Sequence, residues 1–105
     1  MDELGRRFHR AMVTVYETAK RELGYDARRF LQMLSEHGGV ATAKQLVWAD
    51  TPSDGFTTLW TRGRLDLTVE AHMVQAEYES LFTEEERLKA ARRLDDYGWT
   101  EHRRH

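Results

Sequence analysis

Four side chains able to do chemistry occur close together in the segment 64–72 (RLDLTVEAH): Arg64, Asp66, Glu70 and His72. On a helix, Asp66 and Glu70 would lie four positions apart, so their carboxylates would share one face. Two carboxylates with a neighbouring guanidinium and imidazole can act as a general acid and base or hold a metal ion. The alternative is structural: Asp66 caps a helix, and an arginine–carboxylate network ties two helices together. We favour the structural interpretation because nothing around the segment defines a pocket.

The rest of the chain carries no recognisable catalytic or metal-binding motif. Cysteine is absent, which excludes thiolate chemistry and cysteine-ligated zinc. No two histidines lie four residues apart, and the sequences H-E-x-x-H, G-x-S-x-G and the P-loop do not occur. We therefore predict no metal and no cofactor, and we expect that the protein is not an enzyme.

The elements that must position these residues are predicted to be helices. The chain has 105 residues and is 40% hydrophobic, which is enough for one compact core. Apolar residues recur every three to four positions, most clearly over 4–23, as in amphipathic helices. Thr83 with Glu86 three residues later forms a capping box that begins a last helix. We predict an all-α, single-domain bundle of five to six short helices over 1–105, with 98–105 as a frayed tail.

The internal helix boundaries are predicted from caps and turns. Asp26 is a candidate N-cap of a second helix, which the glycine pair 38–39 ends. The segment 50–55 (DTPSDG) is the clearest turn. Residues 65–71 alternate apolar and polar side chains as a strand does, but no other alternating run is present to pair with them. We therefore expect a helix here, with Asp66 as its N-cap.

Basic residues raise the possibility of nucleic-acid binding. The net charge is −2, so there is no global positive field. Two short helices over 42–62 resemble a helix-turn-helix, but the turn around Pro52 is too long and the second helix is poor in base-reading side chains. Arginines near both ends of the chain could form a basic surface: Arg6, Arg10, Arg28, Arg29, Arg92 and Arg93. Acidic neighbours dilute these clusters, which favours a solvated face of mixed charge.

Three tryptophans are notable in so small a chain. Trp60 fits the apolar stripe of its predicted helix, so we expect it in the core. Trp48 and Trp99 each follow a predicted helix end, and tryptophan is enriched at protein interfaces. The alternative, in which both rings fold back onto the core, is equally consistent with the sequence. The interface interpretation predicts a protein partner or a homodimer.

Four motifs stand out along the chain: RFLQML at 29–34, GFTTLW at 55–60, GRLDLTVE at 63–70 and LFTEEE at 81–86. Taken together, they resemble the sequences of a family of small, uncharacterised bacterial proteins. The resemblance covers nearly the whole chain. It implies a bacterial origin and one compact unit, and it implies no activity, cofactor or catalytic residue.

Three functions are therefore open at the level of sequence. The favoured one is a non-catalytic accessory or adaptor module that binds another protein. The alternatives are a DNA- or RNA-binding protein that uses the arginine clusters, and an enzyme centred on Arg64, Asp66, Glu70 and His72. No apolar run is long enough to span a bilayer and no signal peptide is recognisable, so we expect a cytoplasmic protein without membrane association.

Overall fold

The computed structural model describes residues 2–100, and within them the chain is helical without a β-strand. This confirms the predicted all-α bundle. Six α-helices and two 3-10 helices follow one another along the chain: α1 (Glu3–Leu23), α2 (Arg28–His37), α3 (Gly39–Trp48), α4 (Asp54–Thr61), η1 (Leu65–Leu67), α5 (Val69–Met73), η2 (Ala76–Leu81) and α6 (Glu84–Asp96).

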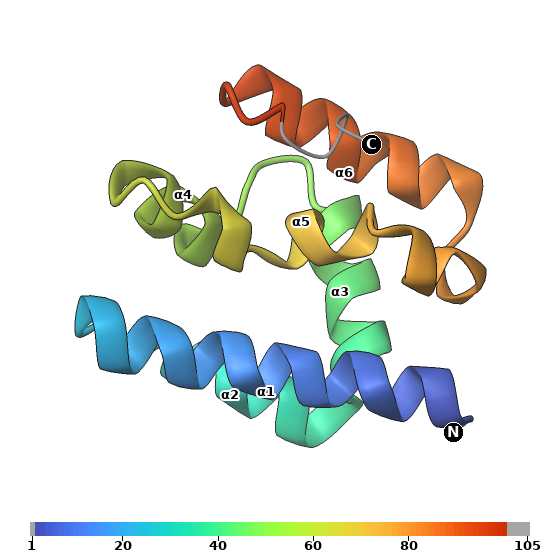
Figure 1. The fold of residues 1–105 in the computed structure, drawn as a ribbon, viewed down its shortest axis with the longest axis horizontal. Coiled ribbons are helices and arrows are strands. Elements are labelled where there is room, and N and C mark those ends of the chain that lie inside the picture. The colour runs from blue at the N-terminus through green and yellow to red at the C-terminus, as the bar shows by residue number, and fades with distance from the viewer. Residues whose placement is uncertain (1, 101–105) are drawn as a thin grey trace.

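The helices are arranged in tiers (Figure 1). Helices α1 and α2 pack together at one edge of the molecule, and α6 lies at the opposite edge. Helix α3 runs from the first pair towards α6, and it contacts α1, α2 and α6. Helices α4 and α5 occupy the middle of the molecule.

Helix α1 is the longest element because an apolar stripe runs along its whole length. The Asp2 carboxylate begins it by accepting a hydrogen bond of 2.7 Å from the Gly5 N–H. Gly24 ends it in the left-handed conformation, where its N–H donates to the Lys20 carbonyl and the Tyr25 N–H donates to the Ala19 carbonyl. The following chain is thereby turned back, so that α2 runs alongside α1.

A glycine allows α1 and α3 to approach closely. A Cβ atom on Gly39 would lie 2.7 Å from the His9 Cα, so no larger residue fits without moving the backbone. The approach is fixed by a hydrogen bond of 2.9 Å from the Gly39 N–H to His9 Nδ1. A side chain of α1 thus caps the N-terminus of α3, which has no cap of its own.

Two apolar clusters form the core. The larger one centres on Phe8, whose ring meets Tyr78 and Phe82 edge to face with centroids 5.0 and 5.1 Å away. The smaller one contains Phe56, Leu65, Ala71 and Leu94, with Tyr97 and Trp99 packed against it. Full burial of a side chain such as Phe8 contributes about 1.5–3 kcal/mol. Both ends of the bundle are therefore held by aromatic packing.

Two of the predicted helix caps are wrong, and one is confirmed. Asp26 does not cap α2, because its carboxylate is bonded to other side chains and Ala27 occupies the N-cap position. The segment 65–71 is helical as predicted but is split into η1 and α5, and Thr68 rather than Asp66 caps α5. The capping box of Thr83 at the start of α6 is present in full.

Candidate binding cleft

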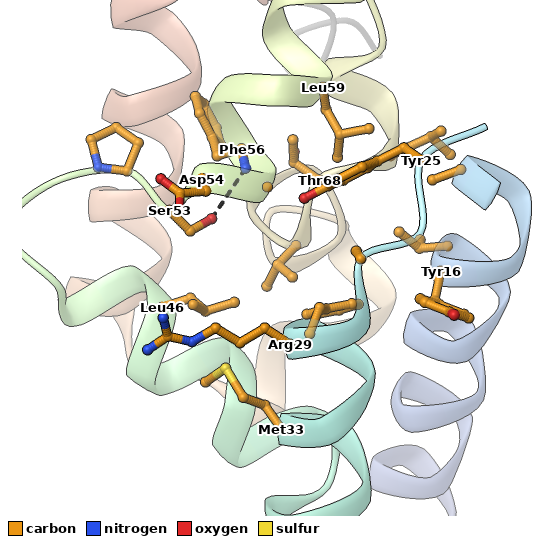
Figure 2. A pocket seen from close by; sticks show the side chains of 18 of the residues that line it. Tyr16, Tyr25, Arg29, Met33, Leu46, Ser53, Asp54, Phe56, Leu59 and Thr68 are labelled. Carbon is orange, nitrogen blue, oxygen red and sulfur yellow. Dashed lines mark hydrogen bonds between the residues drawn. The ribbon is translucent and has the colours of Figure 1, made fainter. Parts of the chain in front are cut away.

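A cleft of about 630 Å³ opens between α1, the start of α2, the connection from α3 to α4, and α4 (Figure 2). Its volume lies within the range of sites that bind small molecules or side chains of a partner. Aromatic and aliphatic side chains make up most of its wall, among them Tyr16, Tyr25, Phe30, Met33, Leu46, Phe56 and Leu59. Thr68 and Glu70 are polar residues at its inner surface, and both are almost completely buried.

Helix α4 forms one wall of the cleft because the chain turns sharply at Pro52 and Ser53. The Ser53 hydroxyl accepts a hydrogen bond of 3.1 Å from the Phe56 N–H, which begins the helix and directs Phe56 inward. Gly55 has no side chain to occupy the space beside this wall. A Cβ atom there would lie 3.6 Å from the Tyr25 hydroxyl oxygen, an ordinary contact distance.

The carboxylate of Asp26 at the cleft is bonded within the protein. It accepts hydrogen bonds from the Tyr16 hydroxyl at 2.5 Å and from Arg28 Nε at 3.0 Å. The bond from Tyr16, followed by that from Arg28, holds the pKa of Asp26 below its ordinary value. The same bond to Asp26 raises the pKa of the Tyr16 hydroxyl. The two shifts favour the ionised carboxylate of Asp26 and the neutral hydroxyl of Tyr16.

The carboxylate of Glu70 is held by an arginine from the opposite side of the cleft wall. Arg93 Nη1 lies 3.0 Å from a Glu70 carboxylate oxygen, and the two side chains are 10% and 4% exposed. The same guanidinium donates to the carbonyls of Leu46 at 3.1 Å and Ala49 at 2.9 Å. Burial raises the pKa of Glu70, and the ion pair with Arg93 opposes that shift. Arg93 thus joins α6 to the end of α3 and to α5.

The remaining charged residues that line the cleft are Arg29 and Asp54. Their side chains form no hydrogen bond or ion pair with any residue in the described range 2–100. Both are exposed to solvent. Asp54 lies in the first turn of α4, where the helix dipole stabilises a negative charge.

The residues predicted as a possible catalytic set do not converge. Arg64 binds both Asp66 carboxylate oxygens at 3.1 Å and also Glu22 of α1 at 2.8 Å. These bonds, first to Asp66 and then to Glu22, raise the pKa of Arg64. Glu70 instead faces Arg93, and His72 Nδ1 lies 2.9 Å from the Thr68 carbonyl oxygen. Arg64 and Asp66 therefore form the tether between helices that the structural interpretation expects, without Glu70 or His72.

The arginines predicted as a basic surface are spread over different parts of the molecule. Arg6 and Arg10 share Glu3 on α1, at 3.8 and 3.4 Å. Arg92 and Arg93 lie on α6, at the opposite edge of the molecule from α1 (Figure 1). Arg93 is buried and therefore cannot contribute to a surface. Arg28 is engaged by Asp26 as described above.

The tryptophans differ in their surroundings. The Trp48 ring is 45% exposed, and its Nε1 donates to Glu86 at 2.8 Å. Burial acts to raise the pKa of Glu86, but hydrogen bonds from Lys44, the Thr83 N–H and Trp48 bring it below its ordinary value. Trp99 packs against the smaller core cluster. The prediction of Trp60 in the core is wrong: its ring is 46% exposed and meets Tyr97 edge to face.

No metal site is evident in the described part of the chain. Among residues 2–100, no group of three or more histidine, aspartate or glutamate side chains is placed to hold a metal ion. None of the helices described combines the length and apolar character needed to cross a bilayer.

Comparisons with protein-family models, with curated proteins and with solved structures find no match to the chain.

We predict that the buried arginine is essential for stability. Replacement Arg93→Met leaves Glu70 buried without its partner and two carbonyls without donors, and should lower the free energy of unfolding by about 3–5 kcal/mol. Arg93→Lys should cause a smaller loss, because an ammonium lacks the planar fork that spans several acceptors. Urea denaturation followed by circular dichroism measures both. The control Arg92→Met, on the exposed side of α6, should change stability by less than about 0.5 kcal/mol. Equal midpoints for the Arg93→Met and Arg92→Met variants would contradict this role.

We also predict that Tyr16 controls the ionisation of Asp26. The replacement Tyr16→Phe removes the hydroxyl whose hydrogen bond contributes most to the lowered pKa of Asp26. The pKa of Asp26 should therefore rise towards its ordinary value. Because the folded-state pKa lies below the unfolded one, this carboxylate stabilises the protein above roughly pH 4 and loses that effect as the pH falls. The variant should therefore show a weaker loss of stability in acid. A carboxyl-carbon NMR titration measures the pKa, with Tyr25→Phe as the control that should leave it unchanged. An identical Asp26 titration in wild type and Tyr16→Phe is the result that excludes this effect.

Proposed function

We propose that this protein is a non-catalytic accessory or adaptor module that binds an apolar segment of another protein in the cleft between α1, α2 and α4. The observation that carries the proposal is the contrast within the cleft. Its wall is mainly apolar and accessible, whereas the carboxylates of the partly exposed Asp26 and the buried Glu70 are already bonded to side chains of the protein. Such a surface gains free energy when apolar groups cover it.

Binding is favoured over catalysis because the two lining charges without a bonded partner among the described residues, Asp54 and Arg29, lie on different sides of the opening (Figure 2). A catalytic site needs several groups that converge on a reacting atom. Here Asp26 is a bonded carboxylate with a lowered pKa, and Glu70 is occupied by Arg93. The segment 64–72 directs its charged side chains to separate partners.

A protein partner is favoured over nucleic acid because several arginines are already bonded to backbone carbonyls of the protein itself. Arg93 is occupied by backbone carbonyls and a buried carboxylate, and Arg87 donates to the carbonyls of Met73 and Val74. Arg62 likewise donates to the carbonyl of Leu23. Binding to phosphates needs a contiguous face of accessible cations. These arginines instead stabilise helix C-termini.

The proposal is tested by closing the cleft without damaging the fold. In Gly55→Met the new side chain projects towards Tyr25 and fills the opening, and Gly55 has no positive φ that would strain the substitution. Because methionine has a higher helix propensity than glycine, stability should be kept or raised. The matched control is Thr57→Met, which adds the same side chain on the exposed side of α4.

The measurement is photo-crosslinking in cells of the source organism. A benzophenone amino acid replaces Met33, which lines the cleft. We expect discrete protein adducts that disappear in the Gly55→Met variant and persist in Thr57→Met. Adducts that are unaffected by Gly55→Met, or the lack of any protein adduct, would show that the cleft does not serve this function.

A further inference from the structure

The charges of the cleft define the partner further. Of the five charged residues that line it, Asp26 and Arg28 bind each other, and Glu70 is bonded to Arg93. Asp54 also has no ion-pair partner in the described range, but it lies in the first turn of α4, where the helix dipole stabilises its negative charge. Arg29 is the cationic lining residue that has no ion-pair partner among residues 2–100.

Arg29 is also placed to act on a bound segment. Figure 2 shows its aliphatic chain lying along the cleft, with the guanidinium directed towards Leu46. Asp54 lies on the other side of the opening in the same view. The methylene groups of Arg29 therefore add to the apolar wall while its charged end stays accessible, as is usual for this side chain.

We infer that the partner segment carries an aspartate or glutamate beside its apolar residues, and that Arg29 binds this carboxylate. The inference rests on the proposed function and names the chemistry of the partner. A guanidinium presents two parallel N–H donors that match the two oxygens of a carboxylate. A charge pair at the rim of an apolar contact fixes the orientation of the segment and selects against basic partners.

The test uses a displayed library of random peptides selected against the intact chain. We expect the selected peptides to contain apolar residues next to Asp or Glu. For such a peptide, Arg29→Glu should weaken binding about tenfold or more, because attraction is replaced by repulsion. Exchanging the peptide's acid for lysine should restore binding to the Arg29→Glu variant. The matched control is Arg92→Glu, which makes the same charge change on α6 and should leave the affinity unchanged.

The outcomes separate this inference from the proposed function. If selected peptides lack an acid, or if Arg29→Glu and Arg92→Glu weaken binding equally, the inference is wrong while blocking by Gly55→Met still supports the cleft. If no peptide is selected, or if Gly55→Met leaves peptide binding unchanged, both fail. Self-association that Gly55→Met abolishes, measured by sedimentation, would make a second copy the occupant. A small amphiphile retained by wild type but not by Gly55→Met in native mass spectrometry would likewise overturn the inference.

Discussion

The guanidinium of Arg93 joins three helices: α3, α5 and α6. It donates to the carbonyls of Leu46 and Ala49 at the end of α3, and it pairs with Glu70 on α5. The C-terminal end of a helix is the negative pole of its dipole and carries carbonyls without intrahelical partners. A buried cation is therefore stabilised there. Removing either the charge or its planar shape would leave several buried groups without partners. The positions of α3, α5 and α6 relative to one another therefore depend on this residue.

The residues that Arg93 holds in place also form part of the cleft. Leu46 and Ala49 form part of one wall, and Glu70 lies at the inner surface, so three partners of Arg93 are also lining residues. Bonding of the polar groups inside the protein leaves the accessible wall mainly apolar. The buried charges of Arg93 and Glu70 are bonded to each other, whereas the guanidinium of Arg29 has no ion-pair partner among the described residues and remains available at the opening. Stability and recognition thus depend on different arginines.

Much of the fold follows from local patterns in the sequence, whereas the cleft does not. The stripe of α1 and the capping box of Thr83 and Glu86 are short-range signals, and both are found in the structure. Asp26 and Asp66 have the right residue type for a cap, but their carboxylates accept hydrogen bonds from side chains instead. Tyr16 and Arg28 donate to Asp26, and Arg64 donates to Asp66.

The functional geometry depends on contacts between residues distant in sequence. Arg93 and Glu70 are 23 positions apart, and Arg93 and Leu46 are 47 apart. Periodicity could have placed Arg93 on the same face of α6 as Glu86 and Ala90, and so indicated that it is buried. Its partners could not be read from the pattern, because they are backbone carbonyls that any sequence provides. The cleft is lined from several helices, so no single segment carries a signal for it.

Native-state hydrogen exchange measures the coupling at this junction directly. If Arg93 joins the helices, the amides in the last turn of α3 and those of α5 should open with the same free energy in wild type. In the Arg93→Met variant, protection of both groups should fall together, while the amides in the middle of α1 keep more of theirs. Independent opening of α3 and α5 in wild type, or unchanged protection in the variant, would contradict the account.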